Sequence, residues 1–408
     1  MRQIVAVGLN LILLAALYVF SRVQGGFFSW FLFYSASFLS LYEWGTSAFS
    51  LNGVNVDCRI STHRLTAGQS LQLECQIERK SFWPLLWVRL SVETQSTVAN
   101  LPSKWIAIRL PLLSRQFSCR FTLDNAARGI YTFSAVSIET KDVFGWQSLR
   151  FEQPYMERVL VVPKSITVRD WKPLATELGG AEQTIRQRTE EASSVVGVRS
   201  YQPGDRLSRI HWPATARRHM LQAKEFERQL TIHLTFVIDA AVLSYATLPG
   251  QTFERALEIC ASLMRYAKER QQRFTLLYHL GAPCLLPTGS SDILLIRAMD
   301  KLAELQPRES TPFAVSLRRL DSLAAAGSTL VIISPALTEE VMQVLTSVRR
   351  HHPIEWIIPM GYADVSPATQ RCVQQAAKLG VRVRQVPATT MLSQSIQAGR
   401  EGLGRERY

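Results

Sequence analysis

The stretch GVRSYQPGDRLSRIHWPATARRHMLQAKEFERQ, at residues 197–229, divides this chain of 408 residues into two regions with different hydrophobic patterns. Before it, apolar and polar residues alternate with period two, which is typical of half-buried antiparallel strands. After it, continuous apolar strands alternate with amphipathic helices, which favours a mainly parallel sheet covered on both faces. The stretch itself holds three acidic residues and six arginines but no recognisable nucleophile, metal cage or phosphate-binding loop.

Residues 51–165 are predicted to form an antiparallel, immunoglobulin-like β-sandwich. Apolar side chains recur at every second position in residues 71–78, 88–93 and 117–123. This alternation buries one face of each strand and leaves the other in water, and turn-forming residues at 67–68 and 128–129 separate the runs. Residues 166–230 are predicted to be a polar excursion followed by the segment quoted above.

Residues 231–408 are predicted to form a Rossmann-like α/β domain. Strands are expected at residues 231–241, 274–280, 329–334, 354–360 and 381–386, and helices at 253–270, 293–305, 314–325, 339–349 and 368–379. Short connections between parallel strands and helices impose right-handed crossovers, so the helices cover both faces of the sheet. The predicted fold is therefore multidomain.

The N-terminal residues 1–50 contain two apolar runs, at 4–20 and 27–42, joined by a turn at 24–26. Each run gives about 25 Å of helix, slightly less than the roughly 30 Å hydrocarbon core of a bilayer. We predict a transmembrane helical hairpin that anchors the protein in the cytoplasmic membrane. A cleaved signal peptide is the alternative, but no small-residue cleavage site follows the first run, and a second apolar run does.

The formal net charge of +13 favours anionic surroundings such as lipid headgroups or nucleic acid. Arg22 in the short turn opposes Arg2 at the N-terminus, so the hairpin itself carries almost no positive-inside signal. The basic C-terminal region favours soluble domains in the cytoplasm. We expect no nucleic-acid partner, because basic and stacking aromatic residues are not interleaved and no reader motif is present.

Six cysteines, at positions 58, 75, 119, 260, 284 and 372, include no CxxC pair and no histidine at metal-ligand spacing. In a reducing cytoplasm they are most simply buried thiols. Cys75 and Cys119 are both predicted to face the sandwich core. A disulfide that joins them across the two sheets is therefore the alternative.

The quoted stretch has its own local chemistry. Pro203 and Gly204 suit the central positions of a type II turn, and Asp205 can accept hydrogen bonds from backbone N–H groups beyond it. Pro213 suits the first turn of a short helix at 214–220, whose last turn would place Arg217 near the negative end of the helix dipole.

A clamp centred on Asp205 is the structural interpretation of this stretch. Its carboxylate could pair with Arg206, Arg209 or Arg217, shielded by Trp212, and so join the sandwich to the α/β domain. The functional interpretation is an arginine-rich recognition surface for an acidic partner or lipid headgroups. The candidate interaction residues are Tyr201, Pro203, Gly204, Asp205, Arg206, Arg209, His211, Trp212 and Arg217.

Residues 128–241 resemble the bacterial domain-of-unknown-function-58 family. The motifs are RGIYTFSAVSIETKDVFGW at 128–146, VLVVPK at 159–164, GVRSYQPGDRLSRIHWPATARR at 197–218 and AKEFE at 223–227. Two residues depart from the family pattern: Val143 stands where proline is usual, and Pro213 where lysine is usual. The second departure removes a cation from the family's basic cluster.

This resemblance implies a membrane-anchored protein with a von Willebrand factor A-like domain after the motif block. It also implies an association with MoxR-type AAA+ ATPases, and in some cases with transglutaminase-like membrane proteins. The family has no established reaction.

A von Willebrand A domain that binds Mg²⁺ has Asp-x-Ser-x-Ser at the end of its first strand, because a hard cation prefers carboxylate and hydroxyl oxygens. Here Asp239 is followed by Ala240 and Ala241, and Ser244 is the nearest hydroxyl. We predict a degenerate metal site and no cofactor. Cys260 and His279 lie within a predicted helix and strand, so we expect no catalytic pair.

These observations favour a membrane-anchored interaction or scaffold protein that is not an enzyme and acts with a MoxR-type AAA+ ATPase or envelope proteins. Its docking crevice would lie at the strand ends, near Asp239, Gly281, Ser334, Gly361 and Pro387. The alternative is an enzyme of cell-envelope metabolism with an unrecognised site in that crevice.

Overall fold

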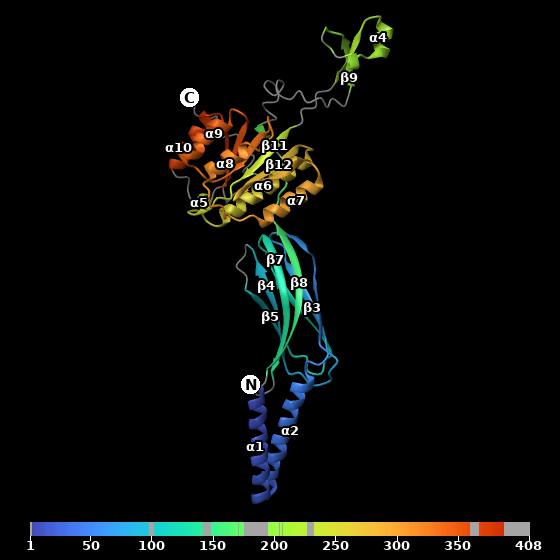
Figure 1. Ribbon diagram of the computed structural model, residues 1–408, viewed down its shortest axis with the longest axis vertical. Helices are drawn as coiled ribbons and strands as arrows, with labels where there is room; N and C mark the ends of the chain where they lie inside the picture. The colour runs from blue at the N-terminus through green and yellow to red at the C-terminus, as the bar shows by residue number, and fades with distance from the viewer. Residues whose placement is uncertain are drawn as a thin grey trace. The chain divides into compact units, whose positions relative to one another are not determined.

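The computed structural model describes residues 2–97, 102–141, 148–169, 171–174, 195–203, 205, 207–226, 232–359 and 367–386 (Figure 1). The chain forms two compact units. The first comprises residues 1–164 and 302–304, and the second comprises residues 165–301 and 305–408. Both combine helices and strands, so the chain is a mixed α/β protein with several sheets.

Two helices, α1 (Arg2–Gln24) and α2 (Phe27–Phe49), begin the first unit. They pack against each other and are joined at Gly25 and Gly26, whose positive φ values of 60° and 87° suit glycine. The buried amide of Asn10 in α1 donates to the buried carboxylate of Glu43 in α2 across 3.0 Å. This hydrogen bond gives two buried polar side chains partners inside an otherwise apolar contact.

The predicted transmembrane hairpin is wrong. Over the residues that the structure describes, no helix combines the length and the apolar character that crossing a membrane requires. This finding overturns the membrane anchor and the predicted location at the cytoplasmic membrane. In α2, Glu43, Gly45, Thr46 and five serines interrupt the apolar residues, and in α1 the described side chains cover only residues 8–24.

Eight strands among the described residues complete the first unit in two sheets, with the orders β1-β3-β6 and β2-β8-β7-β4-β5. The strands are β1 (Asn55–Ile60), β2 (Arg64–Thr66), β3 (Leu71–Glu78), β4 (Val88–Ser96), β5 (Lys104–Arg109), β6 (Gln116–Leu123), β7 (Gly129–Lys141) and β8 (Ser148–Val162). The predicted alternation is present in β3, where the apolar positions are buried and the polar ones are exposed or intermediate. The two sheets share one hydrophobic core, built around residues such as Leu73, Val92 and Phe133.

Three cysteines form a row across the smaller sheet. Cys75 in β3 lies opposite Cys58 in β1 on one side and Cys119 in β6 on the other. Cys58 and Cys75 form a disulfide, and Cys119 is a buried free thiol. The prediction of buried thiols is therefore confirmed for Cys119 and wrong for Cys58 and Cys75, and the alternative disulfide between Cys75 and Cys119 is wrong.

Trp83, in the loop before β4, fixes the end of α2 to the sandwich. Its indole N–H donates to the Thr46 hydroxyl across 2.9 Å, and its ring lies 6.0 Å from that of Tyr42 and 6.1 Å from that of Phe49. The ring covers Gly45, where any Cβ atom would overlap the indole. A glycine is therefore required at this position by close packing.

We expect Gly45→Ala to displace Trp83 and to lower the free energy of unfolding by about 1–3 kcal/mol, the usual cost of overpacking a tight contact. Gly8→Ala in α1 is the matched control, because nothing lies within 4 Å of the added methyl group. Thermal unfolding and tryptophan fluorescence check the prediction. A Gly45→Ala protein with the stability and emission of the wild type would contradict it.

The second unit is built on a sheet with the strand order β13-β12-β11-β14-β15-β16. Its elements are β11 (His233–Ile238), α5 (Val242–Tyr245), α6 (Gln251–Glu269), β12 (Arg273–Leu280), β13 (Ala282–Gly289), α7 (Asp292–Glu304), α8 (Phe313–Asp321), β14 (Thr329–Ile333), α9 (Glu339–Val348), β15 (Ile354–Pro359), α10 (Pro367–Lys378) and β16 (Arg382–Val386). Neighbouring strands run parallel, except that the edge strand β13 is antiparallel to β12.

Helices cover both faces of this sheet. Helices α8, α9 and α10 share a core with one face, in which Leu277, Leu317 and Trp356 are fully buried. Helix α6 packs against β11, β12, β14 and β15. The predicted helices and parallel strands agree with the observed ones to within a few residues, but β13 was not predicted. It contains Pro283 and Pro287, which are tolerated on an edge strand but weaken the strand signal.

Residues 171–174, within the predicted polar excursion, are anchored to the sheet. The buried Trp171 donates its indole N–H to Glu355 of β15 across 2.8 Å, and the Leu174 backbone N–H donates to the other carboxylate oxygen. Arg384 of β16 donates to the same carboxylate across 2.7 Å. The fully buried Glu355 is thereby paired with a cation and hydrogen-bonded, as a buried charge requires. The rest of the excursion, residues 175–194, lies outside the described part of the chain.

Candidate functional site

The carboxyl ends of the parallel strands bring together two buried acidic groups. Asp239 follows β11 directly and is 0% exposed. One carboxylate oxygen accepts from the Ala241 backbone N–H across 2.8 Å, and the other accepts from the Ser334 hydroxyl across 2.6 Å. Ser244 also hydrogen-bonds this carboxylate. The donors come from the ends of two adjacent parallel strands and from α5, so the fold itself assembles the cluster.

Burial raises the pKa of Asp239 to about 6, because the charged form loses its hydration. The hydrogen bonds from Ser244, Ser334 and the Ala241 backbone lower the pKa but offset only part of this effect. Ser334 is held in turn by the Trp356 indole N–H, which donates to its carbonyl oxygen, and by the Ala336 N–H, which donates to its hydroxyl. The carboxylate is therefore held by a rigid internal network.

The second acidic group is Glu309, which lies beside His279 of β12. The His279 Nδ1 atom is 3.0 Å from a Glu309 carboxylate oxygen, and the two side chains are 2% and 5% exposed. Hydrogen bonds from the Thr311 hydroxyl and the backbone N–H groups of Gly281 and Thr311 lower the pKa of Glu309 to about 2. His279 also contributes to this lowering. The Arg319 guanidinium of α8 lies 3.3 Å from Nε2 of the same imidazole.

Backbone hydrogen bonds join the two groups into one cluster. The Glu309 N–H donates to the Ala240 carbonyl, and the Val242 N–H donates to the Glu309 carbonyl. Asp239 and Ser244, the predicted degenerate metal site, thus hydrogen-bond within the protein. Both carboxylate oxygens of Asp239 already accept from protein donors. Among the described residues, no group of three or more His, Cys, Asp or Glu side chains is arranged to hold a metal ion.

Two further residues considered for chemistry are part of the core. Cys260 in α6 is fully buried, and burial raises the pKa of its thiol. A thiol with a raised pKa is a poor nucleophile, because the thiolate is the reactive form. Gly281 supplies a backbone donor to Glu309, whereas Gly361 and Pro387 lie outside the described residues.

The raised pKa of Asp239 makes a signed prediction about stability. Its folded-state pKa of about 6 exceeds the ordinary value of 3.8, so the folded state holds the proton more tightly. The wild-type free energy of unfolding should fall as pH rises from about 4 to about 6, by about 3 kcal/mol at most. Asp239→Asn stays neutral, so its free energy of unfolding should lack this fall between pH 4 and pH 6.

Urea unfolding at several pH values measures this difference. Asp292→Asn is the control, because that carboxylate is 73% exposed and its ion pair with Lys268 contributes little. It should retain the wild-type pH profile. An Asp239→Asn protein whose stability still falls between pH 4 and 6 would refute the assignment.

The motif stretch forms a small module of residues 195–226, which we call the hairpin module. Strands β9 (Val195–Ser200) and β10 (Gln222–Phe226) pair antiparallel and flank the short 3₁₀ helix η1 (Leu207–Arg209) and the helix α4 (Trp212–Arg218). The N-cap residue of α4 is His211, whose Nδ1 accepts from the Ala214 backbone N–H. The helix thus begins two residues before the predicted start and retains Pro213 in its first turn.

Asp205 closes the loop that follows β9. Its two carboxylate oxygens accept from Nη1 and Nη2 of Arg199 at 2.8 and 2.7 Å, and one also accepts from the Gln202 backbone N–H. A bidentate arginine–carboxylate pair is among the stronger and more directional polar contacts in proteins. The structure thus assigns a clamp partner that the sequence analysis did not consider. Arg206 and the side chain of Arg209 lie outside the described part of the chain.

Much of the apolar surface of the hairpin module is exposed. Leu207, Trp212 and Met220 are 72%, 64% and 66% exposed. Trp212, the predicted shield of Asp205, is therefore mostly exposed at the start of α4. Arg217 and Arg218 lie in the last turn of that helix, as predicted.

The remaining candidate residues support the loop. The Tyr201 backbone N–H donates to the Leu221 carbonyl, and the His211 N–H donates to the Gln222 carbonyl. Pro203 is exposed in the turn, and Gly204 lies outside the described residues. Sequence reasoning missed Arg199, Leu207 and Met220. The end of β9 gave no pattern that could single out Arg199. The strand has six residues, which is too short for the alternation of side chains to show which face Arg199 occupies.

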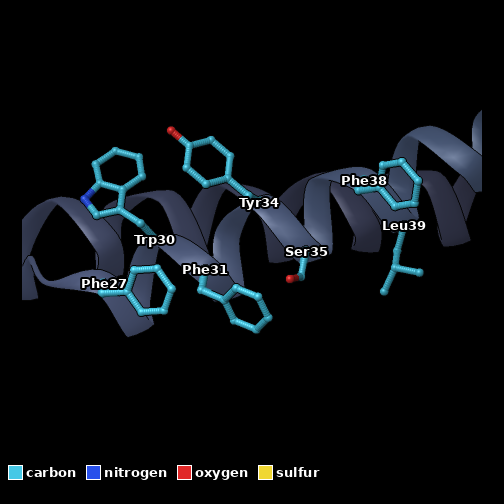
Figure 2. Close-up of a pocket in the computed structure, with 7 residues that line it drawn as sticks. All are labelled: Phe27, Trp30, Phe31, Tyr34, Ser35, Phe38 and Leu39. Atoms are coloured by element: carbon cyan, nitrogen blue, oxygen red, sulfur yellow. The ribbon is translucent and has the colours of Figure 1, made fainter.

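Helix α2 presents a further candidate surface. Figure 2 shows aromatic side chains spaced along this helix around a hollow, which is lined by Phe27, Trp30, Phe31, Tyr34, Ser35, Phe38 and Leu39. Within the set, the rings of Trp30 and Tyr34 stack with centroids 5.7 Å apart. The surface is almost entirely apolar: the side-chain polar groups among its lining residues are the Trp30 indole N–H, the Tyr34 phenol and the Ser35 hydroxyl, and none of these residues is charged.

Residues 197–358 match the family model described as "Protein of unknown function DUF58". The match begins in the hairpin module and ends within β15. It therefore includes the strand-end cluster. A curated relative, the uncharacterized protein YeaD of Bacillus subtilis (strain 168), is 26% identical over 265 residues. The alignment covers 62% of this chain and 63% of that protein, so the chain spans somewhat less than two thirds of the relative.

Solved structures give only remote likenesses. The CARDB domain of the PF1109 protein from Pyrococcus furiosus is 11% identical, covering 28% of this chain and 91% of that one, with a TM-score of 0.19. Cwp6 from Clostridium difficile is 9% identical, covering 82% of this chain and 37% of that one, with a TM-score of 0.18. Scores this low support no argument about fold or function.

Proposed function

We propose that this protein is a binding protein that recognises a partner protein through the hairpin module, and that the partner is a MoxR-type AAA+ ATPase. The observation that carries the proposal is the exposure of Leu207, Trp212 and Met220 within a segment that matches the family model. Large apolar side chains exposed together on a small module are typical of protein interfaces.

The polar part of the module suits the same role. Arg217 and Arg218 are exposed beside these apolar residues, and arginine and tryptophan are the residue types most enriched at interface hot spots. Exposed cationic side chains attract an acidic surface and orient it as it approaches. The Arg199–Asp205 pair holds the loop in place, so little conformational entropy is lost on binding.

An enzymatic role at the strand ends has less support. The acidic groups there, Asp239 and Glu309, are enclosed and already hydrogen-bonded to neighbouring protein groups. A general acid or base must reach the proton that it transfers, and a nucleophile must reach its electrophile. We therefore propose that this cluster stabilises the α/β unit and leaves recognition to the hairpin module.

We expect Trp212→Ala to weaken binding of the purified MoxR-type ATPase encoded in the same genome at least 30-fold, as loss of a hot-spot residue worth about 2 kcal/mol would. Arg217→Gln with Arg218→Gln should mainly lower the association rate and its salt dependence. Biolayer interferometry with ATP and with ADP measures both effects.

Met156→Ala is the matched control, because this side chain is 86% exposed on β8, outside the hairpin module. It should bind the ATPase like the wild type. Equal binding by Trp212→Ala and Met156→Ala would contradict the assignment of the surface. No saturable binding of the wild-type protein would contradict the choice of partner.

A further inference from the structure

The edge strand β5 of the first unit has an apolar outer side. Ile106 and Ile108 alternate with Trp105 and Ala107, whose side chains face the sandwich core. Ile106 and Ile108 are 48% and 60% exposed, and Leu110, just beyond the strand, is 71% exposed. On the adjacent strand the outward positions are polar: Ser91 bonds Ser137, and Arg89 pairs with Glu139. The apolar row is therefore confined to the edge of the sheet.

The same edge carries unpaired strand backbone. Over the part of the chain that the structure describes, β5 is the last strand in its sheet and pairs only with β4. The Thr94 N–H donates to the Ser103 carbonyl across 3.0 Å, which marks these two residues as a hydrogen-bonded antiparallel pair. Hydrogen-bonded and non-hydrogen-bonded pairs alternate along an antiparallel ladder, so the backbone N–H and C=O groups of Trp105 and Ala107 bond to β4. Ile106 and Ile108 therefore direct both N–H and C=O away from the sheet.

Positive charge borders this edge. Arg109 ends β5 and, by strand alternation, lies on the opposite face from Ile108; its Nε lies 3.4 Å from the Ser118 carbonyl of β6. Among the described residues, this guanidinium is not paired with a carboxylate. Lys104, at the start of β5, is already paired with Glu93 across 2.9 Å.

We propose that β5 is a docking edge for an extended acidic segment of another protein, which adds to the sheet as a further strand. The segment would hydrogen-bond the backbone of Ile106 and Ile108. It would place apolar side chains beside those two residues on the outer face and an acidic side chain beside Arg109 at the end of β5, on the face that Arg109 shares with Trp105 and Ala107. Backbone pairing of this kind supplies affinity, and the alternating side chains supply specificity.

Charge argues against a second copy of this chain as the occupant. Two antiparallel β5 strands would bring the Arg109 guanidinium of each chain to the shared edge without a carboxylate from the partner strand, because β5 contains no acidic residue. The net charge of +13 on each chain adds long-range repulsion.

The test uses the full chain and a fluorescent nonapeptide in which Val and Glu alternate. One matched peptide has Lys in place of Glu, and a second has Pro at its centre, which removes a backbone donor. Fluorescence anisotropy should show saturable binding of the Val/Glu peptide, with both matched peptides at least 10-fold weaker. Ile106→Thr with Ile108→Thr should weaken binding at least 10-fold while keeping β-branched side chains on the strand. Arg109→Gln should weaken it and reduce its salt dependence.

Hydrogen exchange on the wild-type protein gives an independent readout that needs no variant. The peptide should protect the amides of Ile106 and Ile108 and leave the Ala107 amide, already bonded to β4, unchanged. Equal binding of the Lys peptide, protection elsewhere, or no saturable binding would overturn the proposal. The proposal would also be overturned if the wild-type protein dimerised and Ile106→Lys abolished the dimer, because a second copy of the chain would then be the occupant of β5.

Discussion

The buried carboxylate of Asp239 is the constraint on which the second unit depends. The parallel sheet is covered by helices, so an acidic group at the end of its strand β11 has no water to solvate it. The Ala241 backbone N–H and the hydroxyls of Ser334 and Ser244 take the place of that water. Their positions fix the turn after β11 against the end of β14. The strand-end cluster therefore uses its polar groups to hold the sheet together.

The hairpin module is stabilised in a different way. Of the side chains described in it, only those of Ile210, Gln222 and Ala223 are buried, so apolar packing contributes little. The bidentate Arg199–Asp205 pair and the cap at His211 supply directional contacts that hold its loop and helix. Large apolar residues remain on the surface because nothing inside so small a module can cover them. This division, a closed strand-end cluster and an open hairpin module, is the physical basis of the proposed binding role.

The parts of the fold that could be predicted were those with a clear hydrophobic period. The period-two pattern of β3 and the apolar run of β11 predicted those strands, and helical spacing predicted α6 and α9 within two residues of their bounds. The membrane hairpin was wrong because apolar content alone was taken as the signal, without the effect of Glu43 and the serines of α2. β13 was missed because its prolines mask an edge strand.

The candidate site was less predictable. Its contacts join residues that are far apart in sequence, or residues in elements too short to show a hydrophobic pattern. The Ser334 hydroxyl reaches Asp239 across 95 positions, and no local pattern indicates that pairing. Arg199 and Asp205 are only six positions apart, yet their contact depends on a turn whose geometry the sequence alone does not fix. Cys58 escaped attention because its partner was sought across the sandwich instead of on the adjacent strand.

A ¹³C NMR titration of the Asp239 side-chain carboxyl, with and without excess Mg²⁺, tests the central claim most directly. If the strand-end cluster is closed, this carboxyl titrates with an apparent pKa near 6, and Mg²⁺ leaves its chemical shift and its pKa unchanged. A pKa below 4, or a shift on addition of Mg²⁺, would show a solvated and accessible carboxylate. Either result would contradict the account of a closed cluster with recognition elsewhere.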